Sequence, residues 1–176
     1  MSFFSAIVDE NDAVHAGGFV APLREALGLT VEEFLPLREG ESHGLDWVDH
    51  DGIIADVWQE DIALEGAEVI ANFSGGPGEG EPAITRHRHG AGTGWYVGTR
   101  LDAAGMRALL HEVYADADVT PSGVADGLEV ITRHGADAVY RIAVNHRDDD
   151  VELEAAGVEL LSGCLLYTSD AADEED

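Results

Sequence analysis

Acidic side chains are the most abundant chemically useful groups in this sequence, with 36 Asp and Glu among 176 residues. Two carboxyl groups held close together can act as nucleophile and general acid or base. With so many carboxylates, their number alone singles out no pair. Asp9 and Glu10 follow an apolar run, at the end of a predicted strand, where a catalytic pair could lie. The favoured alternative is that they fix the loop before Val14 and His15.

Histidines offer a second kind of chemistry. His87 and His89 alternate on a predicted strand, so they share one face and could ligate a metal. Four further residues could complete such a site: Asp46, Asp49, His50 and Asp51. Against this, eight histidines in one chain make such pairs common, and no HExxH or cysteine pattern accompanies them. The sequence therefore predicts no metal site and no cofactor.

A glycine-rich segment, Gly90-Ala91-Gly92-Thr93-Gly94, has the composition of a phosphate-binding loop. A phosphate cradle needs the N-terminus of a following helix to aim its amide groups at the anion. Here the β-type residues 95–97, Trp-Tyr-Val, follow instead. The segment is therefore predicted to be the turn of a hairpin.

The charge balance is unusual: the net charge is −27, all nine basic residues are Arg, and Lys is absent. Such a chain repels nucleic acid and anionic membranes, which excludes both as partners. Binding of cations or a basic partner is one interpretation. The favoured one is a surface adapted to concentrated salt, as in halophilic archaea, where screening suppresses self-repulsion. No apolar run is long enough to span a bilayer and no secretory signal is visible, so a cytoplasmic location is expected.

The expected elements form an α/β pattern. The apolar run 3–8 predicts a buried parallel strand, and residues 22–27 predict a helix that Gly28 terminates. Further strands are expected at 30–37, 53–58, 68–73, 83–89 and 93–99, with loops at 38–52 and 74–81. A helix over 103–115, capped by Asp102, should place one apolar stripe against a sheet. The members of this stripe are Met106, Leu109, Leu110, Val113 and Tyr114.

A change of hydrophobic period marks the best domain boundary, within residues 116–127. Beyond it, residues 128–133 and 138–144 alternate with period two and predict an antiparallel hairpin. The organisation predicted is an α/β domain over 1–118, a small antiparallel β domain over 119–163, and a tail over 164–176.

Three blocks of this chain resemble, in order, the C-terminal part of β-galactosidases of glycoside hydrolase family 42. They are IVDENDAVHAGGFVAPLREALGLTVEEF (7–34), EPAITRHRHGAGTGWYVGTRLD (81–102) and the weaker GLEVITRHGADAVYRIAVNH (127–146). The first two are similar to the family's trimerisation domain, and the third to its small C-terminal β domain. Phe19-Val20 stands where the family usually has Tyr-Pro.

The resemblance implies a partial flavodoxin- or amidotransferase-like sheet-and-helix domain. It also implies that the catalytic barrel, with both catalytic glutamates and the galactoside site, lies upstream, because the match opens only a few residues after Met1. The chain is therefore expected to be a C-terminal fragment with no catalytic, cofactor-binding or metal-binding residue. The parent would be a homotrimer, assembled through the α/β domain, that hydrolyses terminal β-D-galactosides with retention.

Two further hypotheses concern the chain as a whole. It could instead be a stand-alone carbohydrate-binding or interaction module, with a stacking surface made of Trp47, Trp58, Trp95 and Tyr96. Amidotransferase chemistry needs a Cys nucleophile, and the only cysteine, Cys164, lies in the string CLLYTSDAADE (164–174). That string resembles a translated sequencing-library adapter, so the tail is predicted to be non-native.

Overall fold

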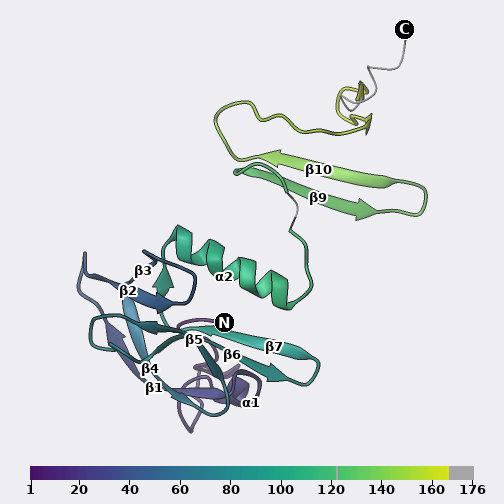
Figure 1. Cartoon of the computed structure of the whole chain (residues 1–176). Coiled ribbons are helices and arrows are strands. Elements are labelled where there is room, and N and C mark those ends of the chain that lie inside the picture. Colours follow the sequence, from purple (N-terminus) through teal and green to yellow (C-terminus); the bar gives the residue numbers. More distant parts are fainter. Residues whose placement is uncertain (122, 167–176) are drawn as a thin grey trace. The chain divides into compact units, whose positions relative to one another are not determined.

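The computed structural model describes residues 1–121 and 123–166. The chain divides into two compact units, residues 1–120 and residues 121–176, and Figure 1 shows the elements of each.

Most of the first unit is antiparallel β-structure. Six of its strands form one nearly closed, barrel-like sheet in the order β7-β6-β5-β2-β3-β8, and β1 pairs with β4 in a separate antiparallel ribbon. The elements are η1 (Ala21–Leu23), α1 (Arg24–Leu27), β1 (Leu29–Pro36), β2 (Ser42–Trp47), β3 (Ile54–Asp56), β4 (Trp58–Leu64), β5 (Glu68–Phe73), β6 (Pro82–His89), β7 (Gly92–Val97), β8 (Arg100–Leu101) and α2 (Ala103–Asp116).

Two hydrophobic cores lie on opposite sides of β7. Because successive side chains on a strand point to opposite faces, Trp95 and Val97 enter one core while Tyr96 enters the other. The first core lies between the sheet and α2: Leu45, Trp47, Ile53, Ala55, Ala71, Phe73, Ala83, Ile84, Trp95, Val97, Leu101 and Leu109. The second involves α1 and the β1–β4 ribbon: Val20, Leu27, Leu29, Val31, Ile62 and Tyr96.

Helix α2 begins where the sequence predicted. The Asp102 carboxylate accepts a hydrogen bond from the backbone N–H of Gly105 at 2.8 Å, which caps the first turn. In Figure 1, α2 lies against the sheet of the first unit, and the buried side chain of Leu109 packs into the first core. The five apolar residues expected to form one buried stripe are nevertheless divided between the core and the surface. Leu109 and Val113 face the sheet, whereas Met106, Leu110 and Tyr114 remain exposed.

The hairpin and the short helix are confirmed. Residues 90 and 91 turn the chain between β6 and β7, whose register pairs His89 with Gly92 and Arg86 with Trp95. Helix α1 ends at Gly28, whose φ of 63° is a left-handed conformation that glycine adopts without strain.

The expected α/β organisation is confirmed only in part: a helix packs on a sheet, but the sheets are mostly antiparallel, and the parallel strand expected at residues 3–8 is wrong. Residues 3–6 form turns, with positive φ at Phe4 and Ala6, and Val8 makes only an isolated antiparallel bridge to Val14, so no parallel strand forms over residues 3–8. An apolar run this short does not reveal its own conformation; here Phe3 packs its ring on Trp58 and Phe34. Parallel pairing also needs long crossover connections, whereas successive strands in this unit are joined mostly by short turns.

Two strands were missed in segments expected to be connections. Strand β2 lies in the supposed loop 38–52, where Leu45 and Trp47 alternate into the core between polar neighbours. Strand β4 covers most of the segment between the expected strands 53–58 and 68–73. In β4 the buried positions include the polar residues Gln59 and Glu60, so no apolar alternation marks that strand in the sequence.

The second unit is built on the predicted hairpin. Strands β9 (Leu128–His134) and β10 (Val139–Asn145) pair antiparallel, with Ile131 opposite Ile142. Two residue pairs join β11 (Gly157–Val158) to β12 (Leu165–Leu166). The tail expected to be non-native begins at the exposed Cys164; its residues 167–176 lie outside the described residues.

Close contact between β7 and α1 yields a stability prediction. A Cβ atom at Gly94 would lie 2.5 Å from the backbone carbonyl oxygen of Ala26, whereas a Cβ at Gly92, on the same strand, would meet nothing closer than 4.0 Å. We expect Gly94→Ala to lower the free energy of unfolding by roughly 1–3 kcal/mol through overpacking. Gly92→Ala, the matched control, should change it by less than about 0.5 kcal/mol.

Urea titration in concentrated salt, followed by tryptophan fluorescence, measures both variants. Equal unfolding midpoints for the two would show that α1 does not approach β7 as closely as described.

Candidate functional site

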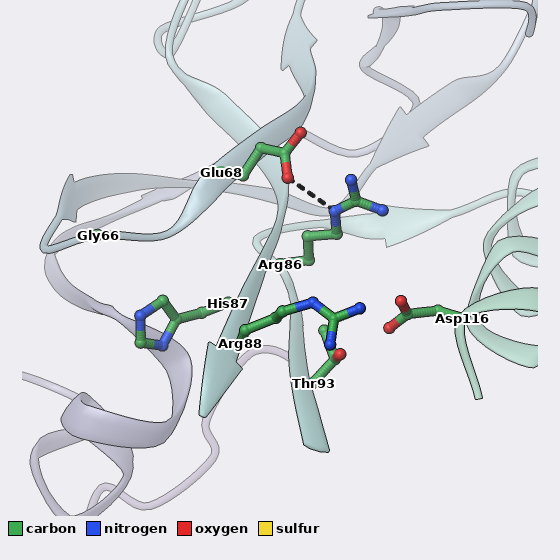
Figure 2. Close-up of a pocket in the computed structure, with 7 residues that line it drawn as sticks. All are labelled: Gly66, Glu68, Arg86, His87, Arg88, Thr93 and Asp116. Atoms are coloured by element: carbon green, nitrogen blue, oxygen red, sulfur yellow. Dashed lines mark hydrogen bonds and ion pairs between the residues drawn. The ribbon is translucent and has the colours of Figure 1, made fainter. Parts of the chain in front are cut away.

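A polar pocket of about 390 Å³ lies beside the β6–β7 hairpin. Seven residues line it, and Figure 2 draws them: Gly66, Glu68, Arg86, His87, Arg88, Thr93 and Asp116. The pocket contains two of the nine arginines of a strongly acidic chain.

Strand geometry positions these arginines. Arg86 and Arg88 are two residues apart on β6 and so project from one face, while His87 projects from the other. The Nε of Arg86 donates a hydrogen bond to Glu68 on β5 at 2.8 Å, and its guanidinium lies 5.9 Å from the centre of the Trp95 ring. In Figure 2, Arg88 extends toward Asp116 and Thr93.

Both carboxylates of the pocket are already engaged. The hydrogen bond from Arg86 lowers the pKa of Glu68. A hydrogen bond from Thr93, together with one from the Trp95 indole and the charge of Arg88, lowers the pKa of Asp116. Both groups are thereby held as carboxylates, so neither suits the role of a general acid near neutral pH. The pocket can bind a polar or acidic group, but it does not present a catalytic pair.

The sequence-derived metal candidates lie on different elements. His87 approaches the carbonyl oxygen of Ala26 at 3.4 Å, whereas His50 lies 3.1 Å from the Glu112 carboxylate on α2. Among the residues that the structure describes, no three His, Cys, Asp or Glu side chains are grouped so that they could hold a metal ion. The sequence prediction that the chain carries no metal-binding residue stays a prediction.

The other sequence candidates have local roles. The Asp9 carboxylate accepts backbone hydrogen bonds from Asn11 at 2.8 Å and Ala13 at 3.0 Å, which lower its pKa and close the loop before Val14. Strand β7 begins within the glycine-rich segment, at Gly92, so no helix starts after these glycines.

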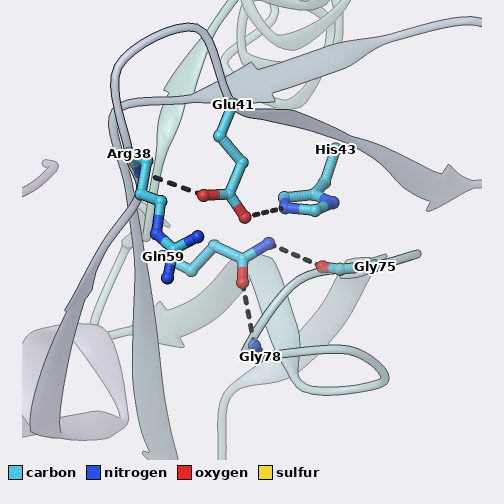
Figure 3. Close-up of polar contacts among 6 residues, drawn as sticks. All are labelled: Arg38, Glu41, His43, Gln59, Gly75 and Gly78. Atoms are coloured by element: carbon cyan, nitrogen blue, oxygen red, sulfur yellow. Dashed lines mark hydrogen bonds and ion pairs between the residues drawn. The ribbon is translucent and has the colours of Figure 1, made fainter.

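A second polar cluster, drawn in Figure 3, was not recognised in the sequence. Gln59 is fully buried on β4; its Nε2 donates to the carbonyl of Gly75 at 2.7 Å, and its Oε1 accepts from the N–H of Gly78 at 2.8 Å. These two bonds hold the loop 74–81 against the ribbon. Nearby, Glu41 accepts hydrogen bonds from the backbone N–H of Arg38 and from His43, each at 3.0 Å. The cluster shapes a loop; an amide between acidic and apolar residues gives no pattern that would reveal it.

Glu60, the neighbour of Gln59, is a buried acid. Neither of its carboxylate oxygens has a hydrogen-bond partner of standard geometry among the described residues. Burial raises its pKa from 4.5 to about 7, with the nearby Tyr96 hydroxyl acting in the opposite direction. Burial also raises the pKa of Tyr96, and the charge of Glu60 adds to this effect. Because β4 and β7 bury these two groups in the second core, Glu60 is an internal titrating group rather than a surface one.

The first unit is thus an antiparallel sheet domain whose pocket carboxylates are engaged in hydrogen bonds and whose Gln59 holds the loop 74–81. Residues 1–120 match the family described as the β-galactosidase trimerisation domain. The chain belongs to this family.

Individual relatives agree with this assignment. Over 165 residues, 93% of this chain, it is 39% identical to a β-galactosidase of an Arthrobacter species; over 155 residues, 87% of this chain, it is 43% identical to the β-galactosidase BgaB of a Geobacillus species. The crystal structure of the β-galactosidase from Bacillus circulans sp. alkalophilus superposes with a TM-score of 0.80 at 30% identity over 95% of this chain. The chain spans only 23% of each of the two relatives and 26% of that structure.

The buried acid predicts a pH-dependent stability. Below pH 4.5 the Glu60 carboxyl is protonated in both the folded and the unfolded chain. Between that value and about pH 7 the unfolded chain releases its proton while the folded chain keeps it, so stability falls as pH rises and the loss is complete above pH 7. The full loss is roughly 3 kcal/mol. We expect Glu60→Gln to be more stable than the unmodified chain at pH 8 and the gain to vanish toward pH 4.5.

Chemical unfolding at a series of pH values, at constant salt, measures this difference. Glu33→Gln is the control, because it removes the same charge from an exposed position on β1. A stability difference for Glu60→Gln that does not change with pH would mean that Glu60 does not titrate inside the core.

Proposed function

We propose that this chain is the non-catalytic assembly portion of a longer β-galactosidase, which hydrolyses terminal β-D-galactosides with retention. The match of residues 1–120 to the trimerisation domain, in a chain that spans about a quarter of its relatives, carries the proposal. Retaining cleavage needs two carboxyl groups about 5–5.5 Å apart, one as nucleophile and one as acid/base. In this proposal both belong to a barrel upstream, which also binds the galactoside.

The parent is proposed to be a homotrimer held together in part by the first unit. Copies that each carry a net charge of −27 repel one another. Assembly therefore needs contact surfaces that are poor in carboxylates and rich in apolar side chains.

A stand-alone carbohydrate-binding module is the weaker alternative. Its stacking surface would require exposed aromatic rings, but Trp47, Trp95 and Tyr96 are buried and belong to the two cores. Trp58 is half-buried and stacks on Phe3. No observation on these four residues favours sugar binding.

As part of the same proposal, we place the parent β-galactosidase in the cytoplasm. Among the described residues, no helix combines the length and apolarity needed to cross a bilayer.

Reading the gene upstream of the Met1 codon tests the proposed function directly. We expect an open reading frame that continues upstream and encodes a catalytic barrel. The present chain, purified by itself, should not turn over nitrophenyl-β-D-galactoside in concentrated salt. A stop codon followed by a ribosome-binding site just before Met1, or measurable turnover, would contradict the proposal.

We further propose that the acidic, lysine-free surface is an adaptation of a haloarchaeal-like host to concentrated salt. In dilute buffer the Debye length grows from about 3 Å at 1 M to about 30 Å at 0.01 M, so the surplus of carboxylates repels over the whole molecule. Dialysis from salt of about 1 M or more into dilute buffer should therefore abolish the far-ultraviolet circular dichroism signal of the fold. A signal unchanged by dialysis would contradict the salt adaptation.

The string that begins at Cys164 is proposed to be a translated adapter. Its codons decide the matter: a nucleotide sequence unlike a library adapter would restore residues 164–174 to the natural chain.

A further inference from the structure

The β1–β4 ribbon is attached to the rest of the first unit mainly by side chains rather than by strand pairing. β1 and β4 form a two-stranded sheet of their own, apart from the six-stranded sheet. The second core holds them in place, because Leu29, Val31 and Ile62 of the ribbon pack with Tyr96 of β7. A two-stranded sheet is at best marginally stable by itself, so the ribbon depends on this contact.

Polar atoms without partners gather at this contact. Among the described side chains, the buried atoms that lack a hydrogen-bond partner of standard geometry are Trp58 Nε1, both carboxylate oxygens of Glu60, and Thr85 Oγ1. Because side chains alternate along a strand, Trp58 and Glu60 lie on the same face of β4 as Ile62, which enters the second core. Thr85 of β6 pairs with Tyr96 and therefore lies on the same face of the sheet. The contact that holds the ribbon thus contains polar groups whose burial costs free energy while it stays closed.

The Glu60 carboxyl reaches from the ribbon to the end of β7. A Cβ atom at Gly98, the residue after β7, would lie 3.2 Å from Glu60 Oε2, so the missing side chain of Gly98 leaves room for the carboxyl. The titratable group that faces Glu60 is the Tyr96 hydroxyl, which lowers the pKa of the carboxyl less than burial raises it. The residue opposite Glu60 on β1 is Phe34, and Thr85 on β6 carries no charge. Among the described residues, no cationic side chain contributes to the pKa of Glu60.

A negative charge at this position is relieved most easily when the ribbon separates from the sheet. An ionised carboxylate in apolar surroundings is strongly unfavourable unless it gains a partner or water. Separation gives the carboxylate water and exposes the second core, which has six buried residues, while the first core, which has twelve, stays intact. Because the free energy of opening rises with the apolar area exposed, opening at the smaller core costs less than unfolding the whole unit.

We propose that the Glu60 carboxyl controls a local opening in which the β1–β4 ribbon separates from the six-stranded sheet. While the carboxyl is protonated, the ribbon stays packed on Tyr96. When the proton passes to water, the carboxylate is stable only in contact with solvent, and the ribbon opens while α2 and the first core stay in place. The hydrogen bonds of Gln59 with the loop 74–81, and the one from Thr99 to the Trp58 carbonyl, tether the beginning of β4. The opening is independent of the assembly role proposed for the chain.

Hydrogen–deuterium exchange of the full chain in concentrated salt tests the opening. Because burial raises the pKa of Glu60, the closed ribbon is favoured below pH 4.5 and loses this advantage as the pH rises to about 7. For these two values, the equilibrium constant for opening rises roughly 70-fold between pH 5 and pH 8. After correction for intrinsic exchange rates, the backbone amides of β1 and β4 should lose protection by about this factor. The loss should disappear in Glu60→Gln and persist in the surface control Glu33→Gln.

The dependence of exchange on urea separates local opening from global unfolding. At pH 8, amides of β1 and β4 should exchange faster than those of β5 and β6. Low urea concentrations should change ribbon exchange little and sheet exchange steeply, because local opening exposes less surface than unfolding. Equal exchange and equal urea dependence in ribbon and sheet would show that only the whole unit unfolds. Ribbon protection that is the same in Glu60→Gln as in the unmodified chain would show that Glu60 does not control the opening. Either result overturns the proposal.

Thiol labelling at one buried position in each core provides a second measurement. Val31 of the ribbon and Ala71 of the sheet are almost fully buried, so a thiol at either position reacts only after opening. In a Cys164→Ser background at pH 8, Val31→Cys should react at least about 10-fold faster than Ala71→Cys. Adding Glu60→Gln should slow the reaction of Val31→Cys at least about 30-fold, and circular dichroism verifies that each variant is folded. Equal rates at the two positions, or no effect of Glu60→Gln, would contradict the local opening.

Discussion

The hydrogen bonds from two tryptophan indoles to two carboxylates of α2 are the constraint on which the first unit depends. Trp47 donates to Glu112, and Trp95 donates to Asp116, one helical turn along. The two indoles are buried, and a buried donor left without a partner costs about 1–3 kcal/mol. The helix therefore cannot rotate or slide on the sheet without losing both bonds.

Several features follow from this one arrangement. Asp116 reaches the β6–β7 hairpin and faces Arg88 in the polar pocket. Leu109 enters the core, and Met106, Leu110 and Tyr114 are left on the outside. The same two carboxylates are turned toward the sheet, so the exposed residues of α2 include no carboxylate. The two hydrogen bonds thus explain both how α2 is attached to the sheet and why its outer face lacks carboxylates.

Charge has opposite consequences at the surface and in the interior. At the surface, the few arginines pair with neighbouring acids, as Arg86 does with Glu68 and Arg100 with Asp56. Such exposed pairs contribute at most about 1 kcal/mol each and are screened by salt. Inside, Glu60 has no hydrogen-bond partner of standard geometry among the described residues, and burial raises its pKa to about 7, so the carboxyl keeps its proton below that pH. Salt screens the first kind of interaction much more than the second.

Prediction from the sequence was most accurate for features of the fold that a few neighbouring residues determine by themselves. The cap at Asp102, the glycine that ends α1, and the hairpin after β6 were recognised because each depends on a few adjacent residues. The buried polar residues Gln59 and Glu60 were missed, because their importance depends on partners that are distant in the sequence. The parallel strand expected at residues 3–8 was wrong, because a short apolar run does not reveal whether it pairs or turns.

The sequence by itself determined the family resemblance, the charge balance and the position of helix α2, since composition, motifs and helical period are properties of the chain alone. Only the tertiary structure decided that the sheet is antiparallel, that the helix buries only two of the five residues of its apolar stripe, and that its carboxylates face inward. These outcomes depend on which segments meet in space. Contact between residues far apart in the chain, such as Trp47 and Glu112, leaves no mark in local periodicity.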